Sequence, residues 1–164
     1  MRRILLTAVL MALAALASAQ APTYFVKADM VRGAQGAMGP VCVPNSVFFG
    51  GEMVVFRAVV YDAATGEELL FDQVQERGIT ATVHLDGMDP FPMFFPPPGG
   101  EAEGEEGPPP GADFFRGPWA IPADYPTGMY TWHIEVSDAA GNTATFDPIG
   151  GAIGLNNVTI QAPN

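Results

Sequence analysis

The sequence predicts an all-β domain, an antiparallel β-sandwich of about seven short strands, and three observations lead to this class. Apolar and polar residues alternate in several segments, as they do in strands that bury one face. The 164 residues include 19 Gly and 16 Pro, which interrupt long helices. No segment shows a convincing amphipathic helix, and no repeat of about 20–50 residues indicates a propeller or solenoid.

The first 19 residues are interpreted as a signal peptide outside the fold. A pair of arginines precedes an apolar run at 4–16, and Ala17-Ser18-Ala19 has the small-x-small pattern of a cleavage site. The run is too short for a comfortable membrane span, so we expect an exported chain without one. Residues 20–164 are long enough for one domain, in the periplasm or outside the cell.

Composition narrows the function classes. Seven Lys and Arg against 18 Asp and Glu give a formal net charge of -11, which argues against binding to nucleic acid because phosphate contacts need a basic surface. Hydrophobic residues make up 48% of the chain, too many for a disordered protein. We interpret the acidic charge as solubility for an exported protein rather than as a binding signature.

The alternating segments define the expected strands. In chain order they are 23–31, 52–62, 79–86, 129–137, 143–146 and 157–161. The strongest, at 52–62, places Val54 and Phe56 on one face and Arg57 and Tyr61 on the other. We expect Arg57 to pair with an acidic neighbour across the sheet, with a partner-binding anchor as the alternative.

An unusual Pro/Gly/Glu-rich insert at 88–118 separates two of these segments. Its two proline triplets exclude a central strand, and its acidic second half is expected to be flexible. Its aromatic residues will either pack over one end of the domain or present an apolar surface to a partner. The candidate partner-binding residues are Phe91, Met93, Phe94, Phe95, Phe114, Phe115 and Trp119.

Several motifs resemble those of bacterial secreted immunoglobulin-like domains. The block Ile121–Trp132 (IPADYPTGMYTW) is similar to their penultimate strand, and the hairpin VSDAAGN at 136–142 to the turn that follows it. Upstream, the segment from Phe49 to Gly66 is similar to their entry strand. The resemblance covers most of 48–161 except the insert. It implies an immunoglobulin-like topology and adhesive, accessory or spacer roles, but no chemistry.

Two histidines form the most specific candidate site. His84 and His133 occupy outward positions of segments that would be neighbouring strands in an immunoglobulin-like topology. Two imidazoles on one sheet face could chelate copper or zinc, with Met88, Met93 and Cys42 as soft ligands. The alternative is a pair of unrelated surface histidines.

The single cysteine, Cys42, cannot form an internal disulfide. A buried inert thiol, an intermolecular disulfide and a metal ligand remain open for it. Asp86 and Asp89, with Asp138 or Asn142, could bind Ca²⁺, but we favour solvated turns as their explanation. Without a hydrolase, phosphate-binding or zinc-protease motif, we expect no enzyme.

The sequence therefore favours an exported, non-catalytic immunoglobulin-like module for protein binding or assembly, with an unidentified exported protein as its partner. The alternative is a periplasmic copper- or zinc-binding protein that uses His84 and His133.

Overall fold

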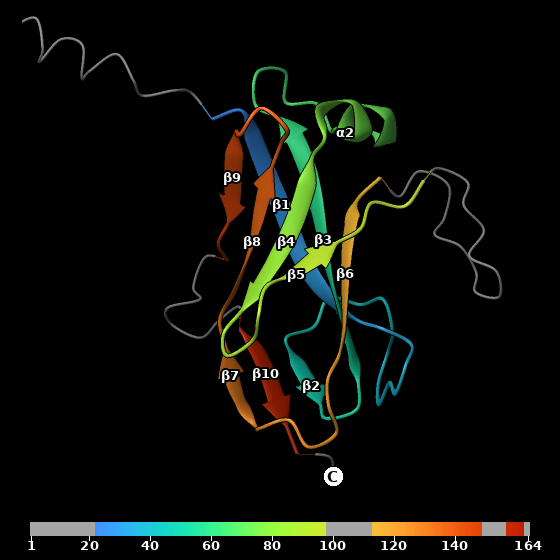
Figure 1. The fold of residues 1–164 in the computed structure, drawn as a ribbon. Helices are drawn as coiled ribbons and strands as arrows, with labels where there is room; N and C mark the ends of the chain where they lie inside the picture. The colour runs from blue at the N-terminus through green and yellow to red at the C-terminus, as the bar shows by residue number, and fades with distance from the viewer. Residues whose placement is uncertain (1–21, 98–112, 149–156, 163–164) are drawn as a thin grey trace, which may run out of the picture.

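The computed structural model describes residues 22–97, 113–148 and 157–162 of the chain. The expected signal peptide and the acidic run at 101–106 lie outside these residues. Within them the protein is mostly β, as the sequence predicts, and it also has a single short helix (Figure 1).

Ten strands form three sheets in the described residues. They are β1 (Tyr24–Arg32), β2 (Val47–Phe49), β3 (Met53–Asp62), β4 (Thr80–Leu85), β5 (Phe91–Met93), β6 (Phe115–Ala120), β7 (Gly128–Tyr130), β8 (Trp132–Ser137), β9 (Thr143–Phe146) and β10 (Val158–Gln161). The sheet orders are β1-β3-β6, β2-β10-β7 and β5-β4-β8-β9. All pairings are antiparallel except that of β10 with β2.

Every alternating segment of the sequence contains a strand, and the prediction for 143–146 is confirmed without a shift. The segment 129–137 is divided, because β7 pairs with β10 whereas β8 pairs with β4 and β9. The change of sheet occurs at Thr131, whose carbonyl accepts a hydrogen bond from the Asp86 N–H at 3.0 Å. Alternation continues through this position, so the sequence gives no sign of the break.

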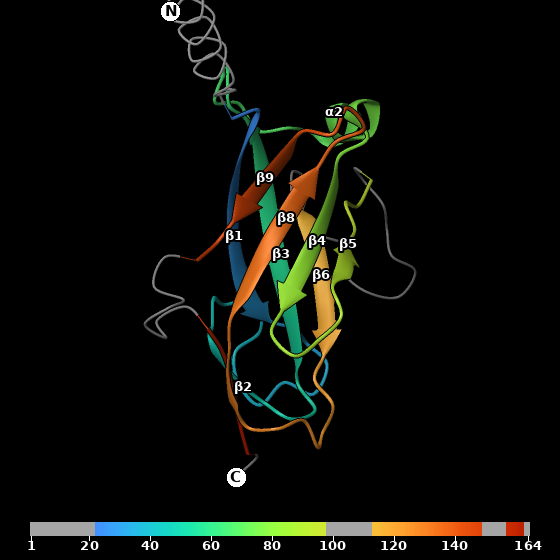
Figure 2. The ribbon, with the colours of Figure 1, turned by 60° about the vertical axis from the view of Figure 1, so that its left-hand side comes forward.

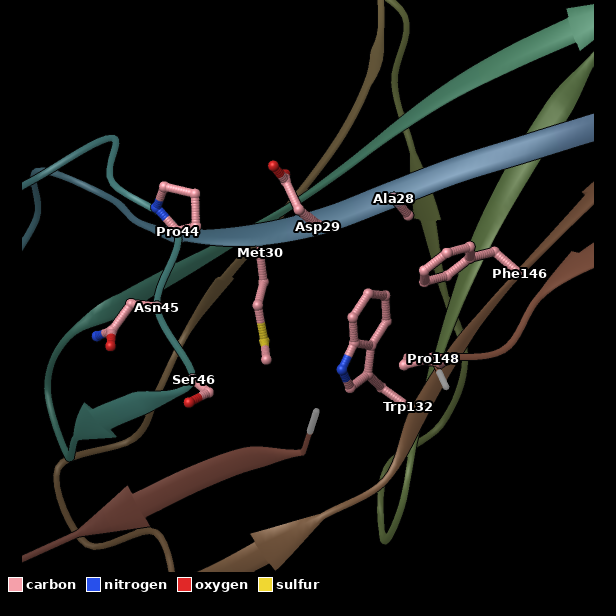
Figure 3. Close-up of a pocket in the computed structure, with 9 residues that line it drawn as sticks. All are labelled: Ala28, Asp29, Met30, Pro44, Asn45, Ser46, Trp132, Phe146 and Pro148. Carbon is pink, nitrogen blue, oxygen red and sulfur yellow. The ribbon is translucent and has the colours of Figure 1, made fainter. Parts of the chain in front are cut away.

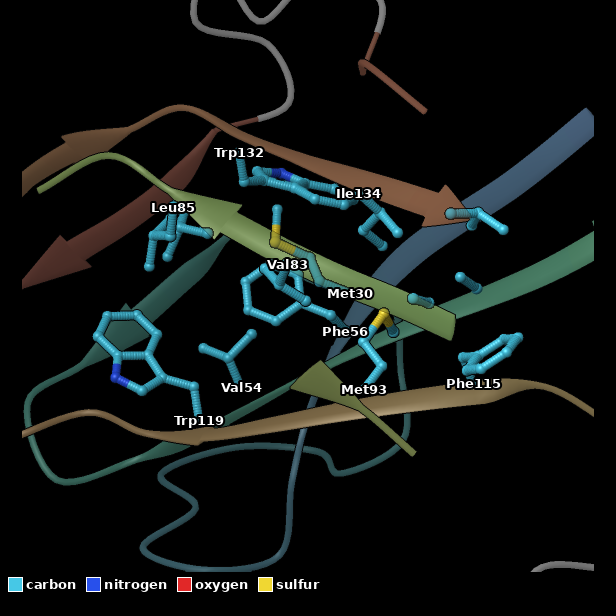
Figure 4. Close-up of a cluster of buried hydrophobic side chains, with 14 of the residues drawn as sticks. Met30, Val54, Phe56, Val83, Leu85, Met93, Phe115, Trp119, Trp132 and Ile134 are labelled. Carbon is cyan, nitrogen blue, oxygen red and sulfur yellow. The ribbon is translucent and has the colours of Figure 1, made fainter. Parts of the chain in front are cut away.

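The hydrophobic core lies between the β1-β3-β6 and β5-β4-β8-β9 sheets (Figure 4). Val54 and Phe56 of β3 are fully buried, and the Phe56 ring lies 5.2 Å from Trp132 of β8 and 6.0 Å from Phe91 of β5. The edges β5 and β6 are joined where Phe94 and Arg116 exchange backbone hydrogen bonds of 2.9 and 2.8 Å. Each sheet therefore has one buried face and one outer face.

The expectation of a flexible insert at 88–118 is wrong at both ends of that range, because β5 lies within it and β6 begins in it at Phe115 and continues to Ala120. Both strands contain proline, and both are the edge strands of their sheets, where a missing N–H is tolerated. Pro92 lies opposite Thr82, and Pro118 opposite Val55. The proline argument correctly excluded central strands but not edge strands.

The helix α2 (Phe71–Arg77) was not predicted. Its seven residues bury one side chain, that of Val74, which is too little for a periodicity to be detected. At its start the Gln73 side chain accepts a hydrogen bond from the Leu70 N–H at 3.0 Å. It ends at Gly78, whose φ of 61° suits glycine, and Arg77 forms an ion pair with Asp62 at 2.8 Å.

A buried ion pair, which the sequence did not indicate, links β1 to the residue before β3. Glu52 is fully buried, and its Oε1 lies 2.9 Å from Nε of Arg32, which is 8% exposed. The Glu52 carboxylate also accepts hydrogen bonds from the backbone N–H groups of Met38 at 2.6 Å and Phe49 at 2.9 Å. These contacts fasten the loop between β1 and β2 to the start of β3.

Candidate functional site

His84 and His133 lie directly opposite each other on the outer face of the β5-β4-β8-β9 sheet. Their neighbours along the strands, Val83 and Leu85 on β4 and Trp132 on β8, are buried, so alternation turns both imidazoles outward. The two rings are stacked, with centroids 4.4 Å apart and planes 7° from parallel. The prediction that these histidines share one face of adjacent strands is confirmed.

Carboxylates flank the histidine pair on both sides along the strands. Glu135 of β8 brings its Oε2 to 3.9 Å from Nε2 of His84. On the other side Asp86 accepts a hydrogen bond from the Thr131 hydroxyl. These carboxylates make the local potential favourable for a cation, and the half-buried rings remain accessible, with 31% of the His84 side chain exposed.

A hollow of about 280 Å³ adjoins the two rings. Its lining comes from the end of β4, the turn after it and the start of β8, and includes Asp86, Met88 and Thr131. The turn is closed by a 3.1 Å hydrogen bond from the Met88 N–H to the Leu85 carbonyl, and Gly87 supplies the positive φ of 78°. The turn therefore brings a thioether-bearing residue to the same hollow as the histidines.

Cys42 does not join the histidines. It lies in the loop after β1, where its N–H donates to the Arg32 carbonyl at 2.9 Å, and it is exposed. A hydrogen bond to Asp29 raises the pKa of Arg57, and Cys42 adds to this increase. Burial lowers the pKa of Arg116, and Cys42 partly opposes this decrease. Cys42 thus interacts with two arginines of the β1-β3-β6 sheet, whereas the histidines belong to the β5-β4-β8-β9 sheet. Cys42 is not among the residues that line the hollow beside the histidines, and its exposure excludes a buried thiol.

No three His, Cys, Asp or Glu side chains gather as metal ligands within the described residues. The calcium hypothesis is not supported by the placement of its residues, because Asp86 and Asp138 lie beyond opposite ends of β8. The Asp138 carboxylate instead organises its own turn, accepting hydrogen bonds from Asn142 and from the Tyr24 hydroxyl at 2.7 Å. The hydrogen bond from the Asn142 side chain, followed in size by the one from Tyr24, lowers the pKa of Asp138 to about 2.

The seven aromatic and methionine residues proposed as one contact surface do not form one. Because β5 and β6 are strands, their inward side chains enter the core, and Met93, Phe115 and Trp119 are only 7%, 2% and 8% exposed. Phe91 and Phe95 pack against the same core. Of this set Phe94 is largely exposed.

Phe114, the remaining member of the set, is half-buried beneath two guanidinium groups. Its ring lies 5.8 Å from Arg57 and 4.8 Å from Arg116. The Arg57 side chain also forms a two-pronged ion pair with Asp29 across the β1–β3 ladder. The expected cross-strand pairing of Arg57 is therefore confirmed.

A larger hollow of about 360 Å³, which the sequence did not indicate, opens beside β1 (Figure 3). Met30 of β1, Trp132 of β8 and Phe146 of β9 contribute apolar walls, and Asn45 and Ser46 contribute polar ones. Its walls come from four separate segments of the chain, so no local sequence pattern could predict it. Among the residues that line it, Asp29 is the single titratable one, so the hollow contains neither a cluster of titratable groups nor a pair of metal ligands.

Comparison with known proteins adds no identification. No protein-family model matches the chain, and no curated protein matches it either. The described part of the chain contains no helix with the length and apolar character needed to cross a bilayer. The histidine pair is thus the arrangement with the most specific chemistry in the described structure.

Proposed function

We propose that this chain is a non-catalytic module that binds a divalent transition metal through His84 and His133. The observation that carries the proposal is the direct cross-strand opposition of the two imidazoles. Imidazole is the commonest metal ligand in proteins and suits both zinc and copper. A ligand pair held on two hydrogen-bonded strands loses little freedom on binding, because the backbone already fixes both residues.

The stacked pair places two imidazoles side by side but must rearrange to chelate a metal. Metal–nitrogen bonds of about 2.0–2.1 Å in a tetrahedral site separate two ligand nitrogens by roughly 3.4 Å. An imidazole nitrogen binds a metal in the plane of its ring, and two stacked planes only 7° from parallel, with centroids 4.4 Å apart, do not meet at one metal, so both rings must turn about χ2 before their nitrogens converge. Glu135 and Asp86 supply favourable electrostatics beside the pair.

The donor set favours Cu²⁺ over Zn²⁺ in intrinsic affinity, following the usual order of divalent metals. Imidazole nitrogen suits both Cu²⁺ and Zn²⁺, whereas Ca²⁺ and Mg²⁺ prefer oxygen ligands. The proposed ligand class is therefore Cu²⁺ or Zn²⁺.

Calorimetric titration of Cu²⁺ and Zn²⁺ into the purified chain, without a polyhistidine tag, tests the proposal. We expect dissociation constants below about 10 μM, corresponding to roughly 7 kcal/mol. The double variant His84→Ala/His133→Ala should lose this binding. The matched control is Thr80→Ala/Ser137→Ala, which alters another opposed pair on the same strands and face. Equal binding by both double variants would refute the proposal.

We further propose that the domain is an immunoglobulin-like β-sandwich of an exported protein. The supporting observations are the core shared by two sheets, together with the sequence motifs at 121–142. The signal peptide interpretation predicts that the exported protein begins at Gln20, which N-terminal sequencing would check. A start at Met1 would contradict it.

Protein binding or assembly remains a second proposal, now resting on Phe94. This side chain is 50% exposed, and its residue lies immediately after the edge strand β5. An exposed aromatic beside a sheet edge suits a partner contact. Phe94→Ser should abolish recovery of an exported partner that the unmodified chain recovers, whereas Phe25→Ser, at another exposed aromatic, should not. Equal recovery by both variants would exclude this surface.

A further inference from the structure

The histidine pair supplies only two of the ligands that a tightly bound metal requires. Structural zinc sites use four protein ligands, and catalytic ones use three and a water. Within the described residues no third His, Cys, Asp or Glu lies in position to complete a group with His84 and His133. The site is therefore incomplete within one copy of the described structure.

The incomplete site lies on an open sheet face. Figure 2 shows β4 and β8 facing the viewer, with none of the drawn strands or the helix covering them. The residues that flank the imidazoles on this face include Thr82 on β4 and Thr131 before β8, whose side chains are short. A second protein surface can therefore approach the two rings without displacing an element of the fold.

We infer that a second copy of this chain completes the site, so that one Zn²⁺ is held by His84 and His133 from each of two copies. The inference rests on the metal binding proposed above. Two copies related by a two-fold axis present the same patch to each other, and a ligand pair on each gives four imidazoles. Four imidazoles satisfy the tetrahedral preference of zinc, which one copy cannot.

Electrostatics makes this association dependent on the metal. Each copy carries a formal net charge of -11 and brings Glu135 and Asp86 beside its histidines. Without a cation, the two patches repel each other through these like charges. A bound Zn²⁺ offsets part of this repulsion, because its two positive charges lie between the four carboxylates of the two copies. The predicted state is a monomer without metal and a dimer with it.

Sedimentation equilibrium of the complete chain with and without Zn²⁺ provides the test, and calorimetry gives the stoichiometry. We expect the mass of one chain without metal, twice that mass with zinc, and one zinc for two chains. Mutating a residue that only hydrogen-bonds to a metal ligand typically lowers metal affinity by roughly 10–100-fold. Because His133 is a proposed ligand itself, His133→Ala should weaken zinc-dependent dimerisation by more than this. The control Thr80→Ala/Ser137→Ala should dimerise like the unmodified chain.

Two further measurements separate this inference from its alternatives. Cys42→Ser removes the exposed thiol, so dimerisation that disappears with this variant would overturn the inference in favour of a disulfide. A monomeric complex with one zinc per chain would also overturn it, while leaving the proposed metal binding intact. Absence of any zinc or copper binding would refute both proposals together.

Discussion

The buried ion pair between Arg32 and Glu52 should cost more stability to break than a more exposed ion pair does, and this difference can be measured. Its side chains are 10% and 0% exposed, whereas those of Arg57 and Asp29, another ion pair that involves β1, are 29% and 40% exposed. Replacing Arg32 by Ala would leave the Glu52 carboxylate buried without a counter-charge. We expect this replacement to lower the free energy of unfolding by about 3–5 kcal/mol.

The corresponding replacement of Arg57 should cost about 1 kcal/mol or less, because its partner Asp29 can be solvated. Urea unfolding followed by circular dichroism measures both. With a slope of about 2 kcal/mol per molar urea, the Arg32→Ala midpoint should fall by roughly 1.5–2.5 M and the Arg57→Ala midpoint by about 0.5 M or less. A loss for Arg32→Ala no larger than that for Arg57→Ala would refute the reasoning.

A double variant separates the charge from the hydrogen bonds. Glu52 accepts the Met38 N–H on Oε1 and the Phe49 N–H on Oε2, and glutamine keeps an acceptor oxygen for only one of them. Arg32→Met/Glu52→Gln removes both buried charges and should recover part of the stability that Arg32→Ala loses, because one of the two N–H groups keeps its acceptor. Arg32→Met/Glu52→Leu leaves both N–H groups without their acceptor and should remain destabilised by about 1–3 kcal/mol for each.

Three further predictions follow from the described contacts. Trp119→Ala should destabilise the fold by about 3–5 kcal/mol, whereas Phe94→Ala should change it by about 0.5 kcal/mol or less, as unfolding curves would show. Asp138, with a pKa of about 2 in the folded state against an ordinary value of 3.8, stabilises the fold above about pH 4, and this contribution fades as the pH falls through 2. The free energy of unfolding of Asp138→Asn should therefore fall less between pH 5 and pH 2 than that of the unmodified chain. The same pH dependence in both proteins would contradict the lowered pKa of Asp138. Gly78→Ala should lower the melting temperature, because φ is 61° and a Cβ would lie 3.1 Å from that of Ala139, while an unchanged value would refute this strain.

Much of the local structure could be predicted because it depends on period-two alternation. The strand at 143–146 and the outward positions of His84 and His133 follow from that pattern alone. The helix α2 escaped because its single buried residue, Val74, creates no periodicity. The insert was misjudged because proline excludes central strands but tolerates edge strands, and the sequence does not say where an edge lies.

The sequence by itself determined the β class, the faces of the main strands and the presence of two outward histidines, because alternation is a local property of the chain. Only the tertiary structure decided which strands are neighbours. That decision brought His84 opposite His133, separated Cys42 from both, and turned Trp119 from a candidate contact into a core residue. The physical reason is that register and sheet order arise from packing between distant segments, which no local pattern records.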